Sequence, residues 1–245
     1  MEHLGTFYGI GVGPGEPGLI TLAAWEALQR CDVIFTPRAQ SASASAARNC
    51  LPPHAIPDKR FREIEFRMDP DREVLREFYT LLAGQIAAEL RAGRNAGYLT
   101  LGDPLTYSTY GYTLAALRGC LPQLRHRTFP GITSYCALAA ATDWPLGEGK
   151  ERVLILPCPE SMIELRHAIE ENDIVVLMKI GGRLPSVLEL LRQLGIAEHC
   201  AFGRHVGMQK EFIARQAHEL EAVSENHGYL ATMLIRKTPP VNRHA

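Results

Sequence analysis

The sequence has no long apolar run and no basic region ahead of an apolar stretch at its start. Its 245 residues contain no window of about 18 uninterrupted apolar residues, the length a helix needs to cross a membrane. Met1 to Gly5 has neither the charge nor the apolar stretch of a secretory leader. We therefore predict a cytoplasmic protein that does not enter a membrane.

A marked excess of charge of either sign is also missing. The formal net charge is -1, which excludes an overall electrostatic attraction to nucleic acid or to an anionic membrane. The six cysteines show no CxxC spacing and no cysteine-histidine metal pattern, so we predict free thiols and no protein-bound metal. Any anionic ligand must be met by a local group of cations.

Hydrophobic periodicity predicts alternating strands and helices, which is typical of an α/β fold. A polar insertion over residues 38–68 interrupts this order. The expected strands cover 5–12, 31–35, 96–101, 127–129, 153–156, 174–178, 201–205 and 229–235. The expected helices cover 19–30, 69–91, 110–118, 133–142, 161–170 and 186–194.

The first half reads as a βαβα arrangement with a mostly parallel sheet, whereas the second half has more strand and fewer crossovers. This change predicts two α/β domains, residues 1–120 and 121–245.

The loop after the first strand contains Gly11-Val12-Gly13-Pro14-Gly15. Glycines at the end of a strand let the backbone approach a phosphate or a nucleotide. A dinucleotide-binding loop, however, has its third glycine where this chain has Glu16, and no Gly-Lys-Ser/Thr follows as in a phosphate-binding loop. A plain proline-glycine turn between strand and helix remains an alternative.

Two later loops place polar groups where strands are expected to end. Gly102-Asp103-Pro104 is followed by several hydroxyl side chains, and Pro130-Gly131-Ile132 is followed by Thr133 and Ser134. Open α/β sheets bind ligands at the carboxyl ends of their strands, so these loops are candidate ligand contacts. In both loops the alternative is that the side chains only cap the following helix.

The three loops together resemble the tetrapyrrole methylase family in their order and spacing, and the likeness extends nearly end to end. The resemblance implies two α/β domains with S-adenosylmethionine in the cleft between them, a fold distinct from the Rossmann-type methyltransferases, and a homodimer. It implies cofactor contacts at Pro14, Leu101, Gly102, Asp103, Thr106, Thr133, Ser134 and Met178, with weaker matches at His205, Val206, Gly207 and Thr232.

Within that family, the tyrosine-rich form of the second loop resembles the enzymes that methylate C20 of a corrin precursor. Tyr107 and Tyr110 replace the Phe-Gly-Arg-Gly form that follows the aspartate in the uroporphyrinogen enzymes. The resemblance implies C20 methylation of precorrin-2 or cobalt-factor II in corrin (vitamin B12) biosynthesis. Methylation at C11, C17 or on uroporphyrinogen III, or a carrier without catalytic activity, are the alternatives.

A tetrapyrrole substrate carries several carboxylates, so a near-neutral protein must gather cations around it. The insertion is rich in basic residues, and we expect Arg38, Arg60 and Arg62 to bind the substrate together with Tyr107 and Tyr110; Arg48, Lys59 and Arg67 extend the basic run. A solvated surface run paired with Glu63 and Glu65 is the alternative for the basic residues. Tyrosines at this spacing also often pack a helix onto a sheet.

Overall fold

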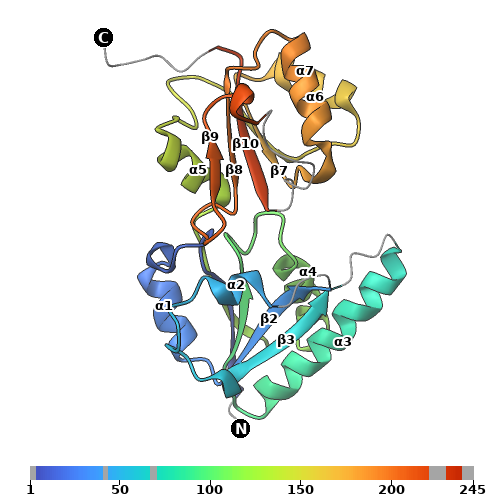
Figure 1. Ribbon diagram of the computed structural model, residues 1–245. Helices are drawn as coiled ribbons and strands as arrows, with labels where there is room; N and C mark the ends of the chain where they lie inside the picture. The colour runs from blue at the N-terminus through green and yellow to red at the C-terminus, as the bar shows by residue number, and fades with distance from the viewer. Residues whose placement is uncertain (1–3, 41–43, 67–70, 221–229, 239–245) are drawn as a thin grey trace. The chain divides into compact units, whose positions relative to one another are not determined.

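The computed structural model describes residues 4–40, 44–66, 71–220 and 230–238 (Figure 1). The chain divides into two compact units, residues 1–133 and 134–245, each built on its own five-stranded sheet. Both units combine a sheet with packed helices, which confirms the predicted α/β class.

The first unit contains an all-parallel sheet with the strand order β3-β2-β4-β1-β5. Its strands are β1 (Thr6–Gly11), β2 (Val33–Ala39), β3 (Phe61–Phe66), β4 (Ala96–Thr100) and β5 (Arg125–Phe129). Its helices are α1 (Leu22–Gln29), α2 (Ala46–Asn49), α3 (Arg72–Arg91) and α4 (Tyr110–Cys120), with short 3-10 turns at Pro17–Leu19 and Asp58–Arg60.

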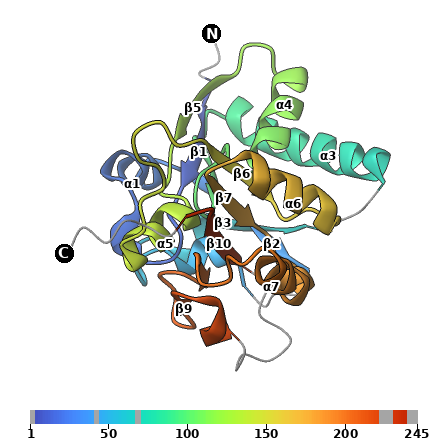
Figure 2. The same ribbon diagram turned by 90° about the horizontal axis from the view of Figure 1, so that it is seen from above.

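Helices α3 and α4 lie side by side on one face of this sheet (Figure 2). Ile86 and Leu90 of α3 and Leu117 of α4 are fully buried there against Phe7 and Tyr98 of the strands. Apolar positions spaced three and four apart place these helical side chains on a single stripe. Burial of that stripe accounts for the predicted helices at 69–91 and 110–118; residues 69 and 70 lie outside the described part of the chain.

Strand β3 is an element that the sequence analysis missed, because it lies inside the segment interpreted as a polar insertion. Ile64 and Phe66 are buried, whereas Glu63 and Glu65 between them are exposed. This period-two alternation is the usual pattern of a half-covered strand. The charged residues at the exposed positions, such as Glu63 and Glu65, led to the prediction of a polar surface segment instead of a strand.

The division between the units falls between Thr133 and Ser134, later than the expected boundary after residue 120. Strand β5 explains the difference, since it pairs in parallel with β1 along its whole length, from Thr6 opposite Arg125 to Ile10 opposite Phe129. Residues 121–133 therefore belong to the first unit.

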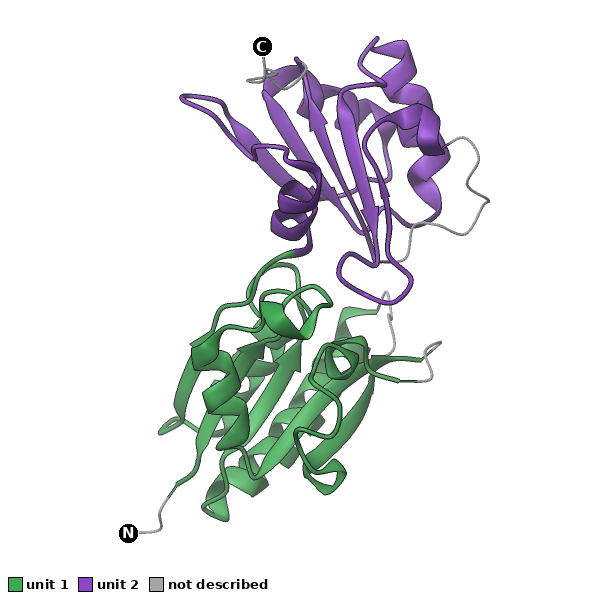
Figure 3. Ribbon diagram, turned by 60° about the vertical axis from the view of Figure 1, so that its left-hand side comes forward, with its two compact units in different colours: residues 1–133 green, residues 134–245 purple. Residues whose placement is uncertain are grey.

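The second unit contains a mixed sheet with the strand order β6-β7-β10-β8-β9 (Figure 3). The strands are β6 (Val153–Pro157), β7 (Ile174–Met178), β8 (Cys200–Arg204), β9 (Phe212–Ala214) and β10 (Ala231–Arg236). The helices are α5 (Ser134–Thr142), α6 (Met162–Glu171) and α7 (Leu184–Gln193), with 3-10 turns at Gly181–Arg183 and Ala217–Leu220. The short strand β9 was not predicted.

Both faces of the second sheet are covered, which explains the unbroken apolar run of β7. Val175 and Leu177 pack in one core with α6 and α7, whereas Ile174 and Val176 pack with Leu138 of α5 in another. A strand buried on both faces loses the alternation of a half-exposed one and becomes apolar throughout.

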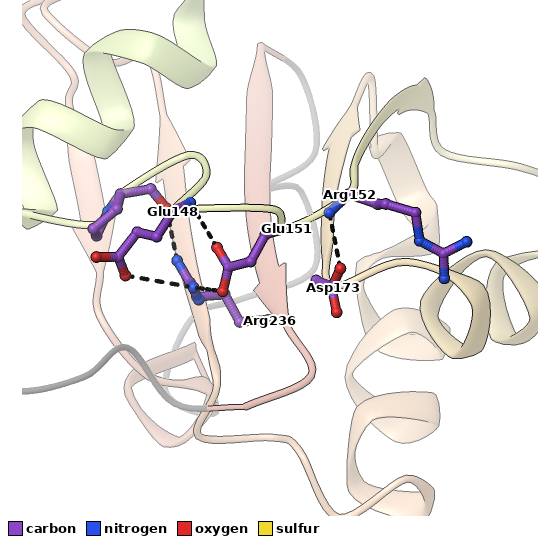
Figure 4. Close-up of polar contacts among 6 residues, drawn as sticks. Glu148, Glu151, Arg152, Asp173 and Arg236 are labelled. Atoms are coloured by element: carbon purple, nitrogen blue, oxygen red, sulfur yellow. Dashed lines mark hydrogen bonds and ion pairs between the residues drawn. The ribbon is translucent and has the colours of Figure 1, made fainter.

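A buried arginine closes one end of this sheet. Arg236, the last residue of β10, is 3% exposed and forms ion pairs with Glu148, at 3.7 Å, and Glu151 of the α5–β6 loop (Figure 4). Its Nη1 also donates a hydrogen bond to the Pro145 carbonyl at 2.9 Å. Because removing one partner of a buried pair leaves a charge without compensation, this contact fixes the loop to the sheet.

Candidate functional site

The three sequence loops of the first unit follow β1, β4 and β5, which are neighbours in the sheet. The carboxyl ends of parallel neighbours meet at one edge, so the loops come together there. Gly13 and Gly102 pair across the first two loops: Gly102 N donates to Gly13 O at 2.8 Å, and Gly13 N donates to Gly102 O at 3.4 Å. Both have positive φ, +79° and +70°, a conformation that glycine adopts at little cost.

Gly131 of the third loop crosses the other two at very short range. A Cβ atom on Gly131 would lie 2.0 Å from the Gly102 carbonyl oxygen, and one on Gly11 would lie 2.7 Å from the same oxygen. No side chain fits at either position. The three loops thus meet backbone to backbone. Gly11 and Gly131 each lie in a loop motif of the sequence, but the motifs alone do not predict that these two glycines lie at the crossing point.

Asp103 fastens the crossing with hydrogen bonds to two loops. Its Oδ1 accepts from Leu105 N at 2.9 Å and from Thr106 Oγ1 at 3.1 Å, and its Oδ2 accepts from Gly131 N at 3.1 Å. Helix α4 begins only at Tyr110, with Thr109 as its N-cap, so Asp103 does not cap that helix. Its carboxylate instead sets the shape of the edge where a ligand is expected.

The remaining predicted cofactor residues of the first unit lie in the same loops. Pro14, beside Gly13, and Thr133, beyond Gly131, are buried, and Leu101 is partly buried. Thr100, directly before Leu101, has a buried hydroxyl with no hydrogen-bond partner among the described residues. A buried polar atom without a partner is uncommon, and its position here fits an edge that receives a polar ligand.

The two predicted substrate tyrosines of the second loop have different surroundings. Tyr107 is 44% exposed and has a φ of +50°, whereas Tyr110 is fully buried. The Tyr110 hydroxyl lies 2.6 Å from Thr128 Oγ1, and its ring stacks on Phe7. Tyr110 thus packs α4 onto the sheet, the structural alternative stated for these tyrosines, and its role in binding substrate stays a prediction.

In the second unit, the predicted residues gather at one end of the sheet. Thr232 at the start of β10 lies opposite Met178 of β7 and opposite Gly203 of β8. Ser134, the first residue of α5, places its Oγ 2.8 Å from Thr232 Oγ1. His205 follows β8 directly, and its amide donates to the Leu230 carbonyl at 3.1 Å.

Backbone strain marks the same end of the second sheet. Lys179, His205 and Leu230 have positive φ values of +54°, +52° and +52°, although none is glycine. Such conformations persist only where surrounding contacts impose them, and they cluster at functional sites. Burial, and then the charges of Arg204 and Lys210, lower the pKa of His205 below its usual value.

Two neighbouring residues are already engaged by the protein. Val206 is 6% exposed and packs in the core with Leu138, so its side chain is not available to a ligand. The Gly207 amide donates to Glu211 Oε2 at 2.6 Å. Of the predicted cofactor contacts in this segment, only the His205 side chain and backbone groups therefore remain available to a ligand.

Among the described residues of the insertion, the basic side chains lie at two different ends of the first sheet. Arg38, near the carboxyl end of β2, pairs with Glu63 at 3.3 Å and Glu65 at 3.1 Å. Arg60 instead lies at the amino end of β3 and donates to the Gln29 and Cys31 carbonyls at 3.1 and 3.4 Å, which closes the end of α1.

Arg62 likewise donates to carbonyls of its own segment, those of Lys59 and Phe61. Because a strand rises about 3.3 Å per residue, the five steps from Phe61 to Phe66 separate this end of β3 from the carboxyl edge by about 16 Å. The predicted substrate role of Arg60 and Arg62 does not fit this position. Arg67 lies outside the described residues.

Residues 6–220 match the family model described as Tetrapyrrole (Corrin/Porphyrin) Methylases. The chain is 29% identical to the cobalt-precorrin-2 C(20)-methyltransferase of Salmonella typhimurium over 95% of this chain and 97% of that protein. It is 28% identical to the precorrin-2 C(20)-methyltransferase of a Sinorhizobium species over 81% of this chain and 83% of that protein.

Solved structures show the same fold. A cobalt precorrin-4 methyltransferase superimposes with a TM-score of 0.68 at 20% identity, over 94% of both chains. The uroporphyrin-III C-methyltransferase of Thermus thermophilus, solved with S-adenosylhomocysteine, gives 0.61 at 21% identity, over 95% of this chain and 98% of that one. Among the described residues, no helix is long and apolar enough to span a membrane.

Proposed function

The chain belongs to the tetrapyrrole (corrin/porphyrin) methylase family, and from this membership we propose that it methylates C20 of precorrin-2 or of its cobalt-containing counterpart in corrin biosynthesis. The observation that carries the proposal is the likeness to two proteins named for C20 methylation, which extends over most of each chain. The tyrosine-rich loop after β4 supports the same position of methylation.

S-adenosylmethionine, when bound, supplies the methyl group from its sulfonium. The residues proposed to hold it form two groups, one in each unit: Pro14, Leu101, Gly102, Asp103, Thr106 and Thr133 in the first, and Ser134, Met178, His205 and Thr232 in the second. The glycine crossing fits this role, because it presents backbone groups at an edge without side chains. The unpartnered Thr100 hydroxyl supports a polar ligand there.

The work left to the protein is binding, alignment and exclusion of water, since transfer of a methyl group from a sulfonium needs no covalent help from a side chain. Rigid contacts within each unit favour the binding and alignment of the two reactants. Asp103 and the paired Gly13 and Gly102 hold the loops of the first unit, and the Ser134–Thr232 contact ties α5 to β10. The lowered pKa of His205 keeps its imidazole neutral at neutral pH, so the ring does not repel a sulfonium.

For the tetrapyrrole, Arg38 and Tyr107 remain the proposed contacts. Arg38 lies toward the carboxyl end of β2, at the same edge as the glycine crossing, and Tyr107 is exposed in the loop that follows β4. Arg38 already pairs with Glu63 and Glu65, so a substrate carboxylate must compete with these partners. We also propose that the enzyme works in the cytoplasm as a homodimer, which sedimentation of the purified protein and cell fractionation test.

The test is turnover with metal-free precorrin-2 and with cobalt-factor II, run side by side without oxygen. We expect one of them to gain a single methyl group at C20, identified by mass and NMR, with an equal amount of S-adenosylhomocysteine. Methylation at C11 or C17, or of uroporphyrinogen III, would overturn the regiochemistry. Binding without any S-adenosylhomocysteine would instead indicate a carrier.

A further inference from the structure

Arg183 is the last residue of the 3-10 turn that leads from β7 into α7, and its guanidinium binds three groups. Nε donates to the Ile180 carbonyl at 3.1 Å, and Nη2 donates to the Lys179 carbonyl at 2.8 Å. Nη1 pairs with the Glu160 carboxylate in the loop between β6 and α6. A single side chain thus connects the ends of two neighbouring strands.

The two carbonyls belong to a turn that needs support. Lys179 has a φ of +54° and Gly181 a φ of +59°, so the chain enters the left-handed region twice within three residues after β7. A lysine does not adopt this conformation unless surrounding contacts impose it. The Arg183 fork binds the carbonyl of the strained residue itself.

The turn begins directly after Met178, one of the residues proposed to contact S-adenosylmethionine. The Met178 carbonyl accepts from Cys158 N at 2.7 Å, which ties it to the β6–α6 loop. The Arg183 guanidinium also acts on Cys158, opposing the rise that burial causes in the pKa of its thiol. Met178 is therefore held from the preceding loop by Cys158 and from the following turn by Arg183.

The hydrogen bonds to the carbonyls matter more here than the ion pair. The Glu160 side chain is 89% exposed, and an ion pair with such a residue adds little. The Arg183 side chain is 28% exposed and meets two carbonyls with a planar fork, a geometry that an ammonium group does not reproduce. Loss of Glu160 alone should leave the turn in place.

We infer that Arg183 is a positioning residue that holds the Lys179–Gly181 turn in its left-handed form and thereby sets the position of Met178 for S-adenosylmethionine. The inference rests on the proposed function. Arg183 acts through the backbone of Lys179 and Ile180, and we do not propose that it touches the cofactor.

The first measurement is the Kd of S-adenosylhomocysteine, by calorimetry, for the full chain and its variants. Arg183→Ala and the milder Arg183→Lys should raise it about tenfold, the effect of losing charge-assisted hydrogen bonds that order a binding segment. Glu160→Gln is the matched control and should bind like the wild type. Thermal unfolding of each variant separates weakened binding from loss of the fold.

A second variant tests the backbone mechanism directly. Glycine enters the left-handed region without a Cβ penalty, so Lys179→Gly placed in the Arg183→Ala protein should recover most of the lost affinity. Hydrogen exchange of the amides of residues 179–183 gives a readout that does not depend on the cofactor. Exchange should quicken in Arg183→Ala and stay unchanged in Glu160→Gln.

Two results would overturn the inference while the wild type binds S-adenosylhomocysteine. One is an unchanged Kd in both Arg183 variants. The other is a weakened Kd that Lys179→Gly does not improve, which would assign Arg183 a general role in folding. If the wild type itself binds neither S-adenosylmethionine nor S-adenosylhomocysteine, the proposed function fails, and the inference about Met178 fails with it.

Discussion

Substitution of Asp103 by asparagine tests how the carboxyl edge of the first sheet is held. The carboxylate accepts hydrogen bonds on both oxygens, from Leu105 and Thr106 on one and from Gly131 on the other. Asparagine has nearly the same shape but a single oxygen. If that oxygen keeps Leu105 and Thr106, the new amide group faces the Gly131 amide, and two donors oppose each other.

The expected loss follows from that geometry. A hydrogen bond to a charged group contributes about 1.5–3 kcal/mol to stability. Asp103→Asn removes the bond to Gly131 and leaves the Gly131 amide without an acceptor, so the free energy of unfolding should fall by about 2–3 kcal/mol. Affinity for S-adenosylmethionine should fall about tenfold to a hundredfold, because the loops proposed to bind it lose their tie.

Chemical denaturation and calorimetric titration measure the two effects separately, and Asp32→Asn is the control. Asp32 Oδ2 also accepts a backbone amide, that of Asn95 at 2.8 Å, but it precedes β2 and so lies at the opposite edge of the same sheet. The control should lose stability without losing affinity. Equal affinity in wild type and Asp103→Asn, with normal turnover, would refute the assignment of Asp103 to the site.

Four further substitutions test other contacts of the structure. Gly131→Ala, whose Cβ would lie 2.0 Å from a carbonyl oxygen, should destabilise by at least about 3 kcal/mol in denaturation, whereas Gly84→Ala in α3, where a Cβ meets nothing within 4 Å, should stabilise by about 0.5–1 kcal/mol. Tyr110→Phe should lose about 1 kcal/mol with its bond to Thr128, but leave the KM for the tetrapyrrole unchanged, and a raised KM would return Tyr110 to the substrate site. The pKa of His205 is lower in the folded protein than in the unfolded chain, so as the pH falls the unfolded chain takes up a proton on this histidine before the folded protein does. The free energy of unfolding should therefore fall as the pH drops below about 6.5. His205→Asn should reduce that fall when denaturation midpoints are compared above and below this pH.

The sequence predicted the parts of the site that depend on local chemistry. Glycine and proline after a strand mark a turn, so the loops at Gly13, Asp103 and Gly131 were predicted at strand ends, where the structure has them. Which of these residues touch was beyond prediction. Pairing of Asp103 with Gly131 depends on β4 and β5 flanking β1, and that order is a property of the whole sheet.

The sequence could not predict the contacts of residues whose partners lie far away in the chain. Arg60 has no local signal that separates a helix cap from a ligand contact, because the Gln29 and Cys31 carbonyls that it binds lie at and just after the end of α1, far back in the chain. Tyr110 has the composition of a binding residue, but Gly9 opposite it leaves room for its ring in the core, where a Cβ on Gly9 would lie 2.2 Å from the Tyr110 ring. In both cases tertiary contacts, which no periodicity reports, decide the role.

The two ends of the first sheet differ in what their polar groups are left to do. At the amino end, Asp32 accepts the Asn95 amide, Asn95 Oδ1 accepts the Thr6 amide at 2.9 Å, and Arg60 closes α1, so the polar side chains there serve the backbone. At the carboxyl end, the Thr100 hydroxyl is buried with no partner among the described residues. Because folding rarely leaves such a group without compensation, the imbalance favours the carboxyl end as the place where a ligand completes the structure, independently of any likeness to other proteins.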